Sequence, residues 1–186
     1  MTGEGTRAQD RLPTLAALCS AYRPRFHSQH IVDRFLMGYE VDGRLHQPPF
    51  RVASMYVDLD MEGDISDARC RDYGVRKVGD IATALTLGSG QLAVDGVLLV
   101  CENGDYPTND KGQILYPRFE FFQQLIEVFE AGGRAVPVFI DKHLSYDWSK
   151  TKTMVEQIER LAVPVLAGSS LPVTWRLPDL DLPLGV

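Results

Sequence analysis

The feature that most constrains the fold is a regular alternation of short apolar runs with longer amphipathic segments along 186 residues. The strongest apolar run covers residues 93–100, Ala-Val-Asp-Gly-Val-Leu-Leu-Val. A run of this kind is typical of a parallel strand that is covered on both faces. Residues 117–131 instead repeat their apolar side chains with helical spacing and are followed by Gly132-Gly133, a helix stop signal.

The same criteria predict eleven elements that alternate strictly between strand and helix. Strands are predicted at residues 14–21, 50–58, 75–78, 93–100, 135–140 and 163–167, and helices at residues 28–38, 64–74, 80–85, 117–131 and 148–161. This order requires right-handed crossovers and places helices on both faces of a mainly parallel sheet. We therefore predict an α/β, Rossmann-like, doubly wound fold.

Three local expectations accompany this prediction. Ser28 is expected to cap the first helix, and Asp42-Gly43 is expected to open a loop that runs through Pro48-Pro49. Pro137 lacks an amide hydrogen for the ladder, so its strand is expected to lie near an edge of the sheet.

The chain length suits a single domain. We expect a flexible N-terminal arm at residues 1–13, a Rossmann-like domain at 14–170 and a Pro-rich C-terminal tail at 171–186. So small a sheet domain leaves one face or edge open, which predicts a homodimer or higher homo-oligomer. The tail either crosses to a second subunit or folds back over the crevice.

Composition narrows the choice of partners and compartment. The chain carries 25 acidic and 19 basic residues, a net charge of −6, and the basic residues form no stripe, which argues against nucleic acid. Three widely spaced cysteines suit a reducing compartment. We find no apolar segment of membrane-spanning length near the start, so we expect a cytoplasmic protein with no membrane contact and a small-molecule substrate.

Polar residues gather where the predicted strands end. In open parallel sheets, ligands bind beyond the carboxyl ends of the strands. The residues expected there to bind substrate are Tyr22, Arg23, Arg25, His27, His30, Asp58, Tyr106, Ser169 and Ser170, joined by Trp175 and Arg176 of the tail if it folds back.

The expected catalytic residues are Glu102, Asp105, Asp141, Lys142 and His143. Lys142 would donate a proton or clamp an anion, and Glu102 or Asp105 would act as the base. The alternatives are a surface salt bridge at 141–143 and simple turn formation at 102–105.

A divalent metal is a further possibility at the same edge. Its candidate ligands are His27, His30, Glu102 and His143. Two histidines spaced by three residues serve equally well as a helix cap or as hydrogen-bond donors to the backbone.

The turn after the first predicted strand tests for a dinucleotide cofactor. Residues 21–28 read Ala-Tyr-Arg-Pro-Arg-Phe-His-Ser and contain no glycine. Because the pyrophosphate needs close backbone approach at this turn, conventional NAD(P) binding is not expected. Arg23 and Arg25 would hold a phosphate by charge instead.

The chain nevertheless resembles a known family. The strand at Val94-Asp95-Gly96-Val97 and the strand end Asp141-Lys142-His143 are similar to the nucleotide-binding half of the glucose-fructose oxidoreductase/inositol dehydrogenase (Gfo/Idh/MocA) family. The resemblance implies NAD(P)-dependent oxidoreductase activity, with Lys142 at the substrate in place of the lysine of a Glu-Lys-Pro strand end.

A closer resemblance connects the chain to a group of uncharacterised bacterial Rossmann-like proteins and implies no particular reaction. It rests on the strings at residues 104–107, 112–113, 116–118, 141–145 and 168–176.

The residues thus predict an enzyme that uses acid–base chemistry on a small polar or anionic substrate, of lyase, isomerase or cyclase type. The family resemblance offers an NAD(P)-dependent oxidoreductase or a degenerate relative as the alternative. A non-catalytic ligand-binding or accessory protein is the third hypothesis.

Overall fold

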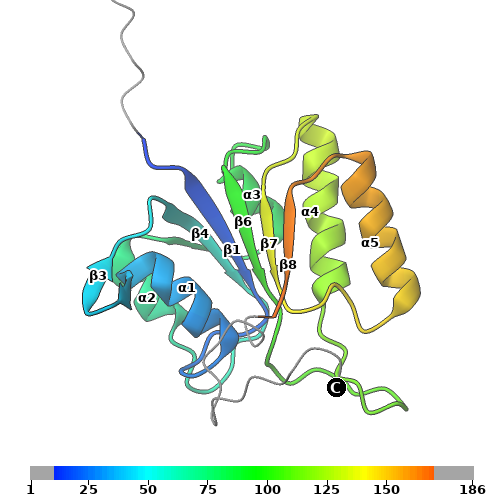
Figure 1. Ribbon diagram of the computed structural model, residues 1–186, viewed down its shortest axis with the longest axis horizontal. Helices are drawn as coiled ribbons and strands as arrows, with labels where there is room; N and C mark the ends of the chain where they lie inside the picture. Colours follow the sequence, from blue (N-terminus) through cyan, green and yellow to red (C-terminus); the bar gives the residue numbers. More distant parts are fainter. Residues whose placement is uncertain (1–10, 170–186) are drawn as a thin grey trace, which may run out of the picture.

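The computed structural model describes residues 11–169 and shows a three-layer α/β arrangement (Figure 1). Its central sheet has six strands in the order β5-β4-β1-β6-β7-β8, and all neighbouring strands are parallel. This order is the doubly wound order of Rossmann folds. The predicted fold class is therefore confirmed.

The elements follow the predicted alternation closely. The sheet strands are β1 (Thr14–Cys19), β4 (Arg51–Val57), β5 (Arg76–Val78), β6 (Gly96–Val100), β7 (Val138–Asp141) and β8 (Val165–Gly168). The helices are α1 (His27–Met37), α2 (Ser66–Tyr73), α3 (Ile81–Thr86), α4 (Arg118–Gly132) and α5 (Trp148–Arg160), and a separate hairpin comprises β2 (Tyr39–Val41) and β3 (Arg44–His46).

Alternate residues of the central strands supply two apolar cores. Ala16 and Leu18 of β1 pack into a core that includes residues of α3, α4 and α5. Leu15 and Ala17 point to the other face, where the core includes residues of α1 and α2. The two helical layers lie on opposite sides of the sheet in Figure 1. Strands buried on both faces account for the near-continuous apolar runs in the sequence.

The prediction of a loop from Asp42 through Pro49 is wrong in its first half. Residues 39–46 form the antiparallel hairpin β2–β3, in which Tyr39 pairs with His46 and Val41 with Arg44. Asp42 and Gly43 form its two-residue turn, with φ of 51° and 72°. Two successive positive φ angles match the strand twist of a hairpin, and an Asp-Gly pair favours them.

One other local expectation also needs correction. The α1 N-cap is Phe26, and Ser28 lies within the helix, where its hydroxyl donates to the Ala21 carbonyl at 2.5 Å. Pro137 precedes β7, which is the strand next to the edge strand β8, in line with the expected position near an edge. Pro137 stands outside the strand, so its missing amide hydrogen removes no ladder donor, and its carbonyl accepts from the Val97 amide. Asp80 caps α3, where its side chain accepts from the Thr83 amide.

No helix within residues 11–169 is long and apolar enough to cross a membrane. Most of the predicted N-terminal arm and the whole predicted tail lie outside the described residues. The proposed roles of Ser170, Trp175 and Arg176 lie there too.

Candidate functional site

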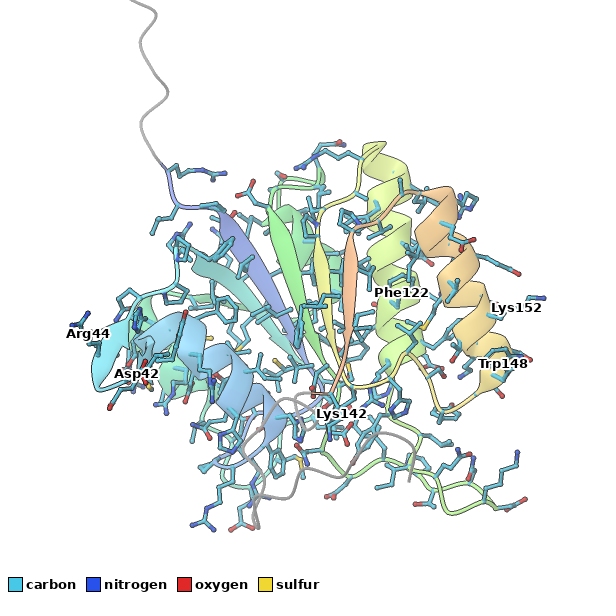
Figure 2. The ribbon with its side chains drawn as sticks, in the orientation of Figure 1. Asp42, Arg44, Phe122, Lys142, Trp148 and Lys152 are labelled. Atoms are coloured by element: carbon cyan, nitrogen blue, oxygen red, sulfur yellow. The ribbon has the colours of Figure 1, made fainter. Side chains whose placement is uncertain are left out.

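The carboxyl ends of β1, β6 and β7 lie side by side in the sheet, because β6 pairs with both of its neighbours. Lys142 follows β7 at this edge, below the strand ends in Figure 2. The structure thus brings residues from three distant parts of the chain together, as the strand-end pattern predicts.

The central contact of this edge joins His27 to Asp141. The imidazole Nδ1 lies 2.7 Å from the Asp141 Oδ2. Asp141 is the last residue of β7 and is buried, and the His27 side chain at the start of α1 is about one-third exposed. A carboxylate at this distance favours hydrogen on Nδ1 and leaves the Nε2 lone pair available as a proton acceptor. Within residues 11–169, Nε2 has no hydrogen-bond partner.

The His27 backbone is also held in place. Its amide donates to the Asn103 side-chain oxygen at 3.0 Å, which ties the start of α1 to the loop after β6. Ser20 strengthens the same junction because its hydroxyl donates to the Asn103 carbonyl at 2.8 Å. The imidazole therefore sits on a fixed backbone next to the end of β7.

Arg118 is a site residue that the sequence predictions missed. Its side chain is 1% exposed, and its Nη2 forms an ion pair with Glu102 Oε2. Its Nε donates to the Asp141 carbonyl at 3.4 Å, and its guanidinium lies 5.3 Å from the Tyr116 ring centre. A positive charge in the first turn of a helix is unfavourable, because the helix dipole is positive at that end. The position of Arg118 in the sequence was therefore a signal that this side chain has a specific acidic partner.

Glu102 is consequently held by two cations. Besides the Arg118 pair, its Oε1 lies 4.0 Å from the Lys142 Nζ. Each of its two carboxylate oxygens therefore faces a cation. The geometry therefore favours His27 over Glu102 as the base.

Three non-glycine residues at this edge adopt left-handed backbone conformations. Arg25, Asn103 and Lys142 have φ of 70°, 76° and 71°. They follow β1, β6 and β7, the three strands whose ends form the site. Such conformations are unfavourable for ordinary side chains and are concentrated at functional sites.

His143 lines a cavity of about 520 Å³ together with Lys142, Leu144, Ala167, Gly168 and Ser169. Partial burial of the ring and the nearby Arg118 charge lower the pKa of His143 below its ordinary value. The cavity brings together the predicted residues Lys142, His143 and Ser169 and has the size of a small-molecule site.

Asp58 and Tyr106 form a second cluster at the end of β4. The hydroxyls of Tyr56 and Tyr106 each donate to the Asp58 carboxylate at 2.7 Å. Burial and these hydrogen bonds raise the pKa values of both tyrosines. Asp58 is therefore engaged within the chain, and Tyr106 reaches across from the loop after β6.

Several predicted residues take other positions. Tyr22 is fully buried and its hydroxyl donates to Asp33 at 2.8 Å, so the prediction that it binds substrate is corrected to a structural role. Arg23 lies over the Phe26 ring. Asp105 and His30 are exposed, and neither contacts the other polar residues of the described site.

The predicted metal ligands do not converge. Among residues 11–169, no group of three or more histidine, cysteine, aspartate or glutamate side chains is arranged to hold a metal ion. His27 is instead paired with Asp141, and Glu102 with Arg118.

The first turn also does not fit the pyrophosphate of a dinucleotide. Ala21 and Tyr22 are fully buried between β1 and α1, where a glycine-rich turn would let the phosphates approach the backbone. The acid at the end of β4, which holds the ribose in dinucleotide-binding folds, is Asp58, and it is already bonded to two tyrosines.

The fold is similar to solved oxidoreductases. A Gfo/Idh/MocA family oxidoreductase from Vibrio cholerae matches with a TM-score of 0.53 and 14% identity over 84% of this chain and 38% of that chain. GenD2 from gentamicin A biosynthesis, solved with NAD, matches with a TM-score of 0.53 and 14% identity over 90% and 37%. Biliverdin reductase from Synechocystis sp. PCC 6803, solved with biliverdin and NADP+, matches with a TM-score of 0.52 and 10% identity over 83% and 37%.

No protein-family model and no curated protein sequence matches the chain. The chain spans 37–38% of the length of the three structures named above. At these identities the similarity concerns the fold. It confirms the predicted resemblance to the Rossmann-like half of Gfo/Idh/MocA oxidoreductases at that level.

Proposed function

We propose that this chain carries the acid–base site of an enzyme that acts on a small polar or anionic molecule. The observation that supports the proposal most directly is the 2.7 Å contact between His27 Nδ1 and Asp141 Oδ2. Asp141 orients the ring and stabilises the imidazolium, so Nε2 can take a proton from a substrate hydroxyl or an acidic carbon. The substrate atom that loses the proton becomes negative.

Lys142 is the cation that would face this developing charge. Its Nζ is only loosely paired with Glu102, at 4.0 Å, and it borders the cavity near His143. Arg118 neutralises Glu102, which keeps that carboxylate from cancelling the charge of Lys142. In this assignment Lys142 is an electrostatic clamp, His27 is the base, and Arg118 is a positioning residue.

The comparisons support an oxidoreductase as the reaction class better than a lyase, isomerase or cyclase. Two of the similar structures were solved with NAD or NADP+ bound. Oxidation of a hydroxyl group needs a base for the proton, which His27 would supply beside the Lys142 charge, and a hydride acceptor such as NAD(P)+, which would have to be bound as well. The turn after β1 does not fit a dinucleotide, which favours the lyase, isomerase and cyclase classes because they need no redox cofactor. The reaction class therefore depends on whether NAD(P) binds elsewhere on the chain.

The tautomer of His27 tests the acid–base site without knowledge of the substrate. Long-range ¹H–¹⁵N spectra of the four histidines, assigned with His27→Gln and the matched control His46→Gln, should show His27 protonated on Nδ1 at neutral pH. Asp141→Asn should change that pattern and leave the other rings unaltered. A wild-type His27 protonated only on Nε2 would remove the basis of the proposal.

Titration with NADH and NADPH, followed by cofactor fluorescence, decides between the reaction classes. Saturable binding supports the oxidoreductase. The absence of binding at millimolar cofactor rejects it and leaves the cofactor-free acid–base enzyme.

A further inference from the structure

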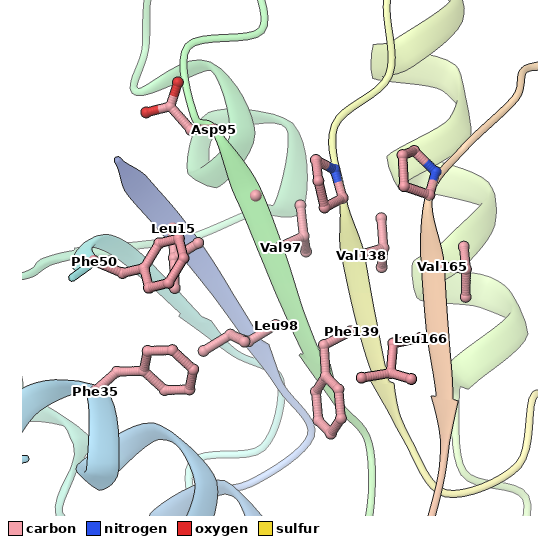
Figure 3. A pocket seen from close by; sticks show the side chains of 13 residues that line it. Leu15, Phe35, Phe50, Asp95, Val97, Leu98, Val138, Phe139, Val165 and Leu166 are labelled. Atoms are coloured by element: carbon pink, nitrogen blue, oxygen red, sulfur yellow. The ribbon is translucent and has the colours of Figure 1, made fainter. Parts of the chain in front are cut away.

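An apolar groove lies on the sheet face that α1 only partly covers (Figure 3). Its volume is about 500 Å³. Side chains of β6, β7 and β8 form its floor, and Phe35 of α1 and Phe50 close one side. We call this surface the β6–β8 groove, and its central residues are Leu98, Phe139 and Leu166.

The groove exposes apolar side chains to solvent. Leu166 is 69% exposed and Phe50 is 39% exposed. On the other side of the same strands, Val97, Val138 and Ile140 are buried in the core that contains α4 residues. A contiguous apolar patch beside a well-packed sheet usually marks an interaction surface.

We propose that residues 171–186 of the same chain occupy the β6–β8 groove. Three features of the sequence support this occupant over an unrelated partner. First, the segment begins three positions after the last residue of β8, and Leu166 of β8 contributes to the groove. The second feature is its content of large apolar residues, namely Leu171, Val173, Trp175, Leu177, Leu180, Leu182, Leu184 and Val186.

The third feature is conformational. Pro172, Pro178 and Pro183 oppose a helix and remove ladder donors, which predicts an extended segment that binds through its side chains. Sixteen extended residues reach roughly 50 Å, and the four residues of β8 span only about 13 Å. The segment is therefore long enough to reverse after β8 and cross the groove.

Cross-linking between introduced cysteines tests this proposal in the full chain. The native Cys19, Cys70 and Cys101 are buried, so they compete little with new thiols. Leu166→Cys is combined with Leu182→Cys, and Leu180→Cys and Leu184→Cys are used to sample the neighbouring positions. The matched control replaces Leu166→Cys with Val155→Cys, which places an exposed thiol on α5.

A short bismaleimide should link the groove pair within one chain about tenfold faster than the α5 control, because docking raises the effective concentration of the two thiols. Intact mass and gel mobility identify the product as a linked single chain. Equal rates for the groove and control pairs would overturn the proposal. Links formed only between two chains would also overturn it and would instead support the predicted homo-oligomer with an exchanged tail.

Discussion

Replacement of Arg118 by methionine should destabilise the protein by about 3 kcal/mol, because it leaves Glu102 without its main counter-charge. The loss of one partner from a buried ion pair costs about 3–5 kcal/mol. Glu102 keeps 20% exposure and its distant Lys142 neighbour, which places the expected cost at the lower end. The substitution also removes the donor to the Asp141 carbonyl and the contact with Tyr116.

Arg160→Met is a matched control for burial. Arg160 pairs with Glu130 through the same kind of contact, at 2.6 Å, but the two side chains are 55% and 44% exposed. Exposed pairs contribute at most about 1 kcal/mol. In urea unfolding followed by circular dichroism, a loss of 3 kcal/mol shifts the midpoint by about 1.5 M, if the slope is about 2 kcal/mol/M.

Two outcomes would refute the assignment of Arg118. The first is a free-energy change for Arg118→Met that equals that of Arg160→Met. The second is simple additivity when Arg118→Met is combined with Glu102→Gln, since removal of the orphaned charge should recover part of the loss. If Arg118→Met does not fold, Arg118→Gln removes the charge but keeps hydrogen-bonding groups and allows the same cycle.

Three further predictions use the same unfolding assay. Acidification from pH 7 to 5 should destabilise the wild type more than His143→Gln. The reason is that folding lowers the pKa of His143 below 6.5, so the unfolded chain binds the proton first as the pH falls. Equal dependence of the two unfolding free energies on pH would contradict this. Gly104→Ala should cost about 1–3 kcal/mol more unfolding free energy than Gly112→Ala. Both glycines have a positive φ, 115° and 74°, but only a Cβ added at Gly104 would meet side-chain atoms at 2.9 Å. Equal costs would refute this prediction. Phe122→Ala in the core should cost about 3–5 kcal/mol, and Trp148→Ala, at an 80% exposed position, should cost far less.

The sheet was predictable because its strands carry a strong and local signal. Residues 14–19 and 96–100 are apolar at every position or nearly so, and both strands are buried on two faces. The hairpin at residues 39–46 was missed because its strands have three residues each and are exposed, so burial imposes no alternation there. The start of β7 was predicted at residue 135 and lies at Val138, because Pro137 stands just outside the strand and pattern alone does not define that boundary.

The location of the candidate site was predictable, but its internal pairing was not. Topology alone brings strand ends to one edge, so Glu102, Lys142 and His27 could be assigned to that edge from the element order. Which of them touch depends on turn geometry, including the positive φ angles of Arg25 and Lys142. Local pattern analysis has no means to predict these angles for such residues.

The roles of the two site carboxylates show why pairing matters for chemistry. Glu102 and Asp141 each follow or end a central strand, and sequence pattern treats them alike. In the structure, Glu102 faces two cations, whereas Asp141 contacts His27, which lies 114 positions earlier in the chain. A carboxylate between cations is engaged in ion pairs, and a carboxylate behind an imidazole orients the ring for proton transfer. The expected base therefore moves from Glu102 or Asp105 to His27, which lies at the same predicted edge of the sheet.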